Sequence, residues 1–351
     1  MGPTDTWTRF AVVDHEQIFG VADEVERLGI LLGSTDGAWI ISLFGAAGAG
    51  KTTLAYEVVK RHAARAGYQR IAWVSAKSMH LTCLGTVDQE RRTEMDWRDL
   101  LVELAVQLKL GIPPNPMMID RELPQALADL GDDQRCLMVI DNVETVREAQ
   151  RAIQFIERES LIRPHKVILT TRESASGFSR RVQEVRWEGL SRDASQRFAE
   201  YLARDDRDLD LAQTDLDEIV AASDRIPLLI KLIVRLAMFE RLSIAQVVAR
   251  IRDKRTELGA SLAAFLYDES LAALSARVGD QRAIKLMIVF CAKAGGESFS
   301  ADEFHRLSGI ANRERFDQAL AAANQLALIR SLAGNTRFTV HSLLREFVCT
   351  E

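Results

Sequence analysis

A short glycine-rich segment constrains this sequence more than any other feature. Residues Gly45-Ala46-Ala47-Gly48-Ala49-Gly50-Lys51-Thr52 fit the pattern GxxxxGK[ST], in which x is any residue. The segment follows the apolar run 39–44 and precedes a helical pattern. In this context backbone N–H groups and the positive end of the helix surround phosphate oxygens. The flanking strand and helix argue against a simple glycine- and alanine-rich turn.

The motif assigns separate roles to its last residues. We expect Lys51 to reach the β- and γ-phosphates of a nucleotide and the Thr52 hydroxyl to bind Mg²⁺. The residues predicted to contact the nucleotide here are Gly45, Gly48, Ala49, Gly50, Lys51, Thr52 and Thr53.

A second apolar run ends in a carboxylate. Residues 137–140 are Leu-Met-Val-Ile, and Asp141 follows, as at the end of a Walker B strand. We predict that Asp141 faces the Mg²⁺ ion, directly or through water. Asn142 comes next, where many hydrolysing relatives have a second acid. Glu144 is a candidate for orienting the attacking water, although a solvated loop position explains it equally well.

An arginine follows a further apolar run. Arg172 ends the segment Thr170-Thr171-Arg172, directly after residues 167–169. Its guanidinium matches phosphate oxygens, so we predict a γ-phosphate sensor, with an exposed loop arginine as the alternative. The catalytic candidates are therefore Lys51, Asp141, Glu144 and Arg172.

The order of the patterns predicts three domains. Four apolar runs, at 39–44, 71–75, 137–140 and 167–170, alternate with helix-length segments, which indicates a parallel sheet covered on both faces. Beyond residue 188 the pattern is helical, and near the C-terminus two short strands flank turn residues 333–335. We predict an α/β P-loop NTPase domain at 1–187, a small helical lid domain at 188–257 and a winged-helix domain at 258–351.

Composition excludes several classes. The formal net charge is −5, so no general basic field is available to bind a polyanion. No long uncharged apolar run and no signal-peptide core are present, and we expect a cytoplasmic protein. The widely spaced cysteines predict free buried thiols rather than disulfides or a zinc site. They are Cys83, Cys136, Cys291 and Cys349.

Taken in order, these motifs resemble the NB-ARC branch of the STAND switch proteins. Its members include plant disease-resistance proteins, apoptosome scaffold proteins, and bacterial regulators and defence proteins. Three further segments carry the resemblance: Phe19-Gly20, Ile226-Pro227-Leu228 and Val340-His341-Ser342.

The resemblance implies roles for these segments. Phe19 and Gly20 would lie near the adenine, Pro227 would pack near the nucleotide, and His341 would contact the β-phosphate of ADP and latch a closed state. From the residues alone, His341 is more typical of a structural histidine. The sequence departs from the family pattern at four positions. It has Val21 where the family has arginine, Asn142 where it has a second acid, Arg225 where it has glycine, and Ser342 where it has the latch aspartate.

The resemblance further implies an ATP/ADP switch. It would bind ADP in a closed resting state and ATP with Mg²⁺ in an oligomerising signalling state, with slow ATP hydrolysis between them. Effector and sensor parts would lie outside this sequence, which favours an excised core.

The main alternative is a DNA-binding initiator or transcription regulator. The expected recognition helix, 313–326, has a mixed charge that does not favour nucleic acid. A motor ATPase would need fast turnover and an arginine finger, and neither is visible.

Overall fold

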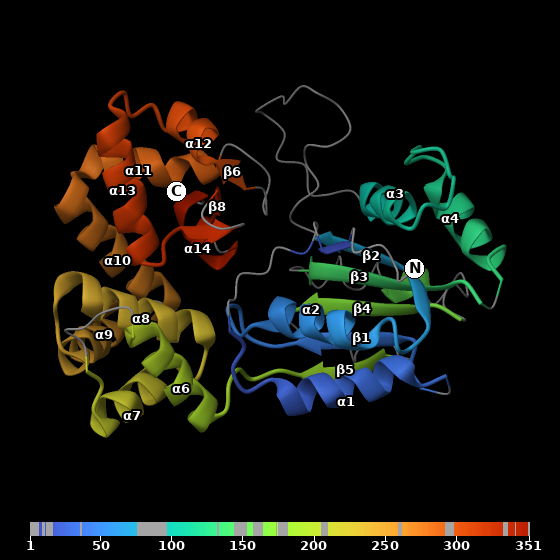
Figure 1. Cartoon of the computed structure of the whole chain (residues 1–351), viewed down its shortest axis with the longest axis horizontal. Coiled ribbons are helices and arrows are strands. Elements are labelled where there is room, and N and C mark those ends of the chain that lie inside the picture. Colours follow the sequence, from blue (N-terminus) through green and yellow to red (C-terminus); the bar gives the residue numbers. More distant parts are fainter. Residues whose placement is uncertain are drawn as a thin grey trace. The chain divides into compact units, whose positions relative to one another are not determined.

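The structure is a computed structural model. It describes residues 7–8, 11, 17–35, 37–75, 97–131, 133–143, 153–156, 164–172, 174, 182–204, 210–258, 262–291, 298–332, 336–340 and 342–349. The chain divides into two compact units, whose elements are labelled in Figure 1. The first comprises Met1–Val13, Val21–Ala46 and Lys51–Trp187, and the second comprises Asp14–Gly20, Ala47–Gly50 and Glu188–Glu351.

A five-stranded parallel sheet forms the centre of the first unit. The strands are β1 (Ile40–Phe44), β2 (Tyr68–Ser75), β3 (Arg135–Val143), β4 (Lys166–Thr171) and β5 (Val182–Arg186). Their order is β2-β3-β4-β1-β5, and every pairing is parallel. This confirms the predicted α/β core. Strand β5 was not predicted; it is an edge strand in which Val185 alone is fully buried.

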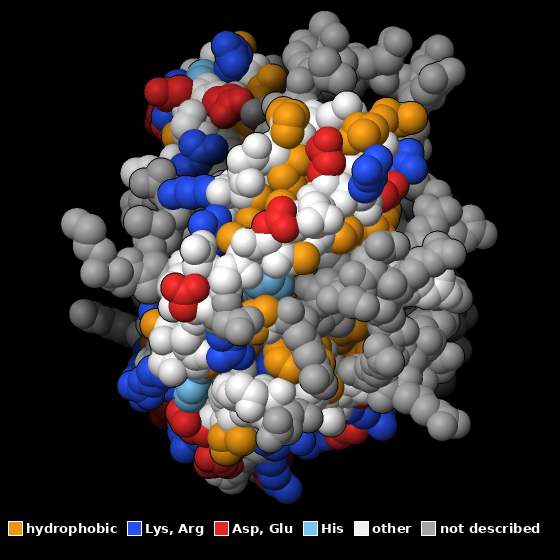
Figure 2. Space-filling view, turned by 90° about the vertical axis from the view of Figure 1, so that its right-hand side faces the viewer, with side chains coloured by type: hydrophobic (Ala, Val, Ile, Leu, Met, Phe, Trp, Pro, Cys, Tyr) orange, Lys and Arg blue, Asp and Glu red, His pale blue; other side chains and the backbone are white. Residues whose placement is uncertain are grey.

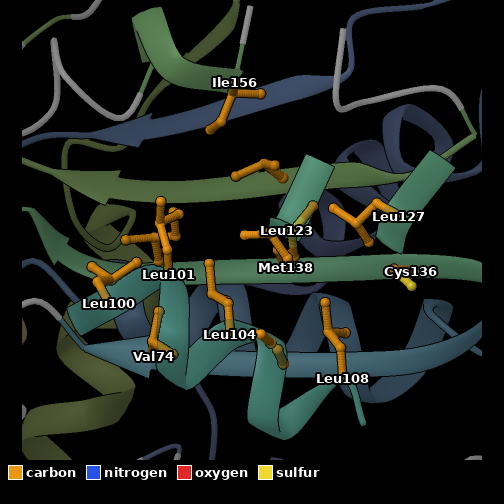
Figure 3. Close-up of a cluster of buried hydrophobic side chains, with 14 of the residues drawn as sticks. Val74, Leu100, Leu101, Leu104, Leu108, Leu123, Leu127, Cys136, Met138 and Ile156 are labelled. Carbon is orange, nitrogen blue, oxygen red and sulfur yellow. The ribbon is translucent and has the colours of Figure 1, made fainter. Parts of the chain in front are cut away.

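Helices cover both faces of this sheet. On one face, α3 (Trp97–Gln107) and α4 (Ile119–Ala128) pack on β2 and β3 (Figure 3). The buried side chains there include Val74, Leu100, Leu101, Leu104, Leu108, Leu123, Leu127 and Met138. On the other face, Tyr56 of α2 (Lys51–His62) contacts Trp73, with 6.4 Å between ring centroids. The helix α1 (Ala22–Gly33) packs beside α2.

Among the described residues of the second unit, the part that follows Glu188 starts with four helices. They are α6 (Arg192–Ala203), α7 (Gln213–Ala222), α8 (Pro227–Glu240) and α9 (Ile244–Leu258). The Ser191 hydroxyl accepts a hydrogen bond from the Ala194 N–H, so Ser191 caps the N-terminus of α6. Pro227 is the first residue of α8, where its missing N–H breaks no helical bond. Because α8 is buried on most sides, it forms the core of this part of the unit.

The remainder of the second unit combines helices with a small antiparallel sheet. Its helices are α10 (Leu262–Val278), α11 (Asp280–Ile288), η2 (Val289–Cys291), α12 (Ala301–Ser308), α13 (Arg313–Gln325) and α14 (Ser342–Cys349). The strands β6 (Phe299–Ser300), β7 (Arg330–Leu332) and β8 (Arg337–Thr339) are ordered β6-β8-β7. The predicted terminal pair of strands is confirmed as β7 and β8, which pair antiparallel.

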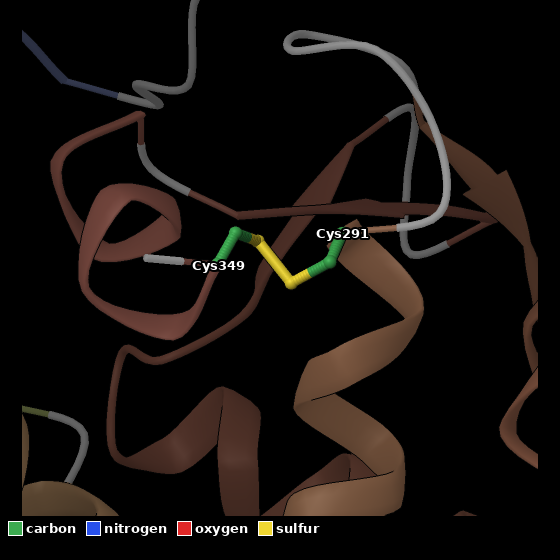
Figure 4. Close-up of a disulfide and its surroundings, with 2 residues drawn as sticks. All are labelled: Cys291 and Cys349. Carbon is green, nitrogen blue, oxygen red and sulfur yellow. A yellow bond between two sulfur atoms is a disulfide. The ribbon is translucent and has the colours of Figure 1, made fainter. Parts of the chain in front are cut away.

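The prediction of free thiols is wrong for two cysteines. Cys291 in η2 and Cys349 at the end of α14 form a disulfide, with 5.4 Å between their Cα atoms (Figure 4). Their separation of 58 residues gave no spacing signal, because packing of α14 against η2 brings them together. Cys136 is buried and free as expected, and Cys83 lies outside the described residues.

The surface carries charges of both signs. Figure 2 shows hydrophobic side chains grouped between basic and acidic ones on one side of the molecule. The most exposed large hydrophobic side chains of the first unit include Ile30, Met117 and Val106. Among the described helices, none has the length and apolarity needed to cross a membrane.

Candidate nucleotide-binding site

The glycine-rich loop connects β1 to α2 and depends on glycine at two positions. A Cβ atom on Gly45 would lie 2.1 Å from the Trp187 carbonyl oxygen, so a side chain cannot fit there. Gly48 has φ 75°, and a Cβ atom on it would lie 2.9 Å from the Leu228 Cβ. These positions give the loop its shape immediately before α2 begins at Lys51. The loop therefore leads to a helix N-terminus, whose N–H groups favour phosphate.

The Lys51 side chain lies across its own loop. Its Nζ donates hydrogen bonds to the Gly45 and Ala46 carbonyl oxygens, each at 2.8 Å. The ammonium group is thus held beside the loop backbone by neutral acceptors. Phosphate oxygens are stronger partners for an ammonium group than carbonyls, because both groups are then charged.

Thr52 and Asp141 face each other across the sheet edge. The Thr52 hydroxyl donates to Asp141 Oδ1 at 2.9 Å, although 89 residues separate the two. Asp141 is 3% exposed, and burial raises the pKa of its carboxyl group. The hydrogen bonds from Thr170 and Thr52 and the positive charge of Lys51 oppose this rise. A cation beside this carboxylate would offset its lost hydration.

The oxygens at this position fit a magnesium ion. Mg²⁺ prefers hard oxygen ligands and is commonly held by one or two carboxylates together with substrate phosphates. Thr52 and Asp141 supply a hydroxyl and a carboxylate within hydrogen-bond distance. Within the described ranges no group of three or more His, Cys, Asp or Glu side chains could hold a metal alone. The protein ligands thus suit a metal that is shared with phosphates.

Strand β4 brings Arg172 close to the start of the loop. Phe44 pairs with Thr171 in the parallel register, and the Gly45 N–H donates to the Thr171 carbonyl at 3.3 Å. Arg172 follows Thr171 directly. The end of β4 is therefore the strand end next to the glycine-rich loop.

The segment before α8 contacts the middle of the loop within the second unit. The Leu228 N–H donates to the Gly48 carbonyl at 3.4 Å, immediately after Pro227. Asp224 and Arg225 precede it with φ of 48° and 61°, in the left-handed region that glycine adopts easily. The Arg225 carbonyl accepts from the Leu190 N–H at 3.0 Å. The backbone therefore has the left-handed geometry expected for a glycine, but the residue is arginine.

Phe19 and Gly20 pack on α6. The Phe19 ring lies 5.4 Å from the ring centroids of both Phe198 and Tyr201. Gly20 has φ 61°, and a Cβ atom on it would lie 2.2 Å from the Ala194 Cβ. Val21 is buried and stands at the N-cap of α1. Glycine at position 20 is therefore required by close packing.

Not every predicted residue is placed. Glu144 and His341 lie outside the described residues, so their roles stay predictions. The structure also adds residues that were not among the predicted candidates. The hydrogen-bond network of Asp141 includes Thr170, Asn142 and Ser75. A polar residue at the end of the apolar strand was the only sequence signal for Thr170. Nothing in the sequence pointed to Ser75.

Comparison with known proteins agrees with this geometry. A family model described as NB-ARC domain matches residues 21–207, just over half of the chain. Among curated proteins no significant match is found. The structure of a STAND protein (Signal Transduction ATPase with Numerous Domains) with a tetratricopeptide repeat sensor, from Pyrococcus horikoshii, has a TM-score of 0.60 and 15% identity. That match covers 97% of this chain and 43% of the other, so this chain spans about two fifths of its length.

Two ORC structures are also similar, at lower scores. Drosophila ORC bound to DNA has a TM-score of 0.41 and 16% identity, over 93% of this chain and 94% of the other. The Aeropyrum pernix ORC2 protein has a TM-score of 0.40 and 15% identity, over 98% of both chains. The likeness to the Pyrococcus horikoshii protein is one of fold.

Proposed function

This chain belongs to the NB-ARC family of P-loop NTPases, and on that premise we propose that it is an ATP/ADP switch. It binds ADP in a closed resting state and ATP with Mg²⁺ in a state that self-associates. Slow hydrolysis returns it to rest. The observation that carries the proposal is the approach of Thr52 to Asp141 beside a lysine folded over the glycine-rich loop.

The loop residues bind the phosphates in this proposal. Lys51 exchanges its two carbonyl partners for β- and γ-phosphate oxygens, and the N–H groups from Gly48 to Thr53 surround the same oxygens. Thr52 and Asp141 hold Mg²⁺, which neutralises phosphate charge when bound. Arg172 senses the γ-phosphate from the end of β4, and Glu144 orients the attacking water.

A switch requires that the two nucleotides stabilise different arrangements of the chain. We assign residues 188–257 to a helical lid and residues 258–351 to a winged-helix domain. Helices α6–α9 support the first assignment, and α10–α14 with the β6-β8-β7 sheet support the second. Pro227 belongs to the lid and His341 to the winged helix, while Phe19 and Gly20 lie by the adenine. The proposed contacts to ADP thus come from segments that are far apart in the chain.

We propose that ATP hydrolysis is slow because Asn142 stands where many hydrolysing relatives have a second acid. The Asn142 amide nitrogen donates to Asp141 Oδ2 at 3.0 Å, and an amide does not accept the proton of an attacking water at neutral pH. Glu144 is then the remaining candidate for that role. The effector and sensor parts are partners outside this sequence.

The DNA-binding alternative gains little support from α13, its expected recognition helix. The Arg313 guanidinium lies 2.6 Å from an Asp302 carboxylate oxygen and 3.0 Å from an Asp317 oxygen. The positive charge of Arg313 is therefore already balanced by neighbouring carboxylates. A salt-dependent gel shift with duplex DNA that is lost in Arg313→Ala would favour the alternative.

Light scattering after gel filtration tests the switch. We expect a single mass close to 39.2 kDa with ADP, and a larger species with Mg²⁺ and a non-hydrolysable ATP analogue. Lys51→Ala should remain at the lower mass with either nucleotide. Equal masses for the wild type with both nucleotides would contradict a self-associating ATP state.

Thermal melting tests the His341 latch. His341→Ala should show a smaller rise in melting temperature on adding ADP than the wild type, because ligand stabilisation follows affinity. A lost hydrogen bond of about 0.5–3 kcal/mol corresponds to roughly two- to 150-fold in affinity. An equal rise in both proteins at the same ADP concentration would show that His341 does not contact ADP.

A further inference from the structure

Strand β3 contains a bulge next to the candidate metal site. Ile140 pairs with Leu169 and Val143 pairs with Thr171, so Asp141 and Asn142 together stand opposite Thr170. Asn142 has φ 59°, a left-handed conformation that asparagine tolerates better than most residues. Bulges redirect side chains at the edges of sheets. Here the bulge brings the side chains of Asp141 and Asn142 together.

The Thr170 hydroxyl joins the bulge to Asp141. It accepts a hydrogen bond from the Asn142 backbone N–H at 2.8 Å and donates one to Asp141 Oδ1. Thr170 is 1% exposed, so water cannot easily replace this hydroxyl. One buried group therefore fixes both the backbone of the bulge and one oxygen of the carboxylate.

The Asn142 amide fixes the other carboxylate oxygen. Its Nδ2 donates to Asp141 Oδ2 at 3.0 Å and lies 3.3 Å from the Ser75 hydroxyl on β2. With Thr52 at the start of α2, donors from several elements hold Asp141 in one orientation. A second carboxylate at position 142 would instead place two negative charges at this distance.

We propose that Asn142 and Thr170 are positioning residues for the magnesium site. They hold the Asp141 carboxylate in the orientation in which it and Thr52 bind the metal, so little reorganisation accompanies metal binding. Asparagine in place of an acid thus has a positive role in retaining the metal, besides removing a base. The inference rests on the proposed nucleotide-binding function.

The experiment measures Mn²⁺ binding to the ADP-loaded protein by electron paramagnetic resonance, and ADP affinity in EDTA by calorimetry. Asn142→Gly deletes the amide and keeps a residue that readily adopts φ 59°. Thr170→Val deletes the hydroxyl, and Thr170→Ser keeps it. The exposed Thr214→Val is the control for Thr170→Val.

We expect Asn142→Gly and Thr170→Val to weaken Mn²⁺ binding by about tenfold or more, as for other groups that orient metal ligands. Thr170→Ser and Thr214→Val should stay within about twofold of the wild type, and ADP affinity in EDTA should be unchanged throughout. Mn²⁺ affinity of Asn142→Gly within twofold of the wild type would overturn the inference, as would a parallel loss of ADP affinity in EDTA. Failure of the wild type to bind ADP in EDTA would instead contradict the proposed function.

Discussion

The Thr52 hydroxyl and the Asp141 carboxylate lie 2.9 Å apart, one at the first turn of α2 and the other in the bulge of β3. The strand order explains how they meet. Strand β4 separates β1 from β3, so the end of β3 is two strands away from the strand that leads into the loop. The carboxyl ends of parallel strands share one edge, where ligands of open α/β sheets bind.

Replacing Asp141 with asparagine should have different effects on folding stability and on metal binding. Burial raises the pKa of Asp141, so folding disfavours its charged form, and the wild type loses stability as pH rises through that pKa. Without metal, the melting temperature of the variant relative to the wild type should therefore increase as pH rises above the ordinary pKa of an aspartate. The Mg²⁺ dependence of nucleotide binding should disappear in the variant. A melting difference that does not change with pH would show that Asp141 is not destabilised by its charge.

The Cys291–Cys349 disulfide should stabilise the end of the second unit. Closing a loop of 58 residues contributes about 4 kcal/mol in the chain-entropy model. Non-reduced protein, denatured and titrated with a thiol reagent, should show two thiols, and reduced protein four. Reductant should lower the melting temperature of the wild type but leave that of Cys291→Ser unchanged. Four thiols without reductant would show that the bond does not form.

Arg225→Gly should stabilise the protein. Arginine at φ 61° is disfavoured, whereas glycine adopts this conformation freely. After subtracting the larger unfolded-state entropy of glycine, we expect a gain of about 0.5–1 kcal/mol in the free energy of unfolding. Arg204→Gly is the matched control. Arg204 has φ −60°, which arginine adopts without strain, so glycine at this position should lower the stability of the protein. Urea unfolding of both variants tests this, and a loss of stability in Arg225→Gly would contradict it.

The sequence predicted the parts of the fold that have strong local patterns. The strands around Ile41, Val74, Val139 and Ile168 are continuous apolar runs because both faces of the sheet are covered. The edge strand around Val185 has mostly polar neighbours, so its pattern resembles a loop. Ser191 and Pro227 stand at the starts of α6 and α8, where capping and N1 preferences depend on the local sequence.

In the candidate site too, the residues within a local motif were predicted and those that depend on tertiary contacts were not. The loop glycines and Lys51 stand in one short motif, whereas the meeting of Thr52 with Asp141 was expected only from the pattern of a second strand. The roles of Thr170 and Asn142 depend on a bulge, and a bulge is a shift in register between two strands. Likewise, the Cys291–Cys349 bond depends on packing between segments far apart in the chain. Such relations are set by tertiary structure rather than by local pattern.

Calorimetric titration of ADP into nucleotide-free wild type, Lys51→Ala and Lys285→Ala tests whether the glycine-rich loop binds the nucleotide. Lys285 is an exposed lysine of α11, far in sequence from the loop, and serves as the control for loss of one positive charge. We predict tight binding by the wild type and by Lys285→Ala. For Lys51→Ala we predict a loss of about 100-fold in affinity, because a charge-assisted contact to phosphate contributes roughly 1.5–3 kcal/mol. Equal ADP affinity in all three proteins, with all three folded, would contradict the assignment of the nucleotide site.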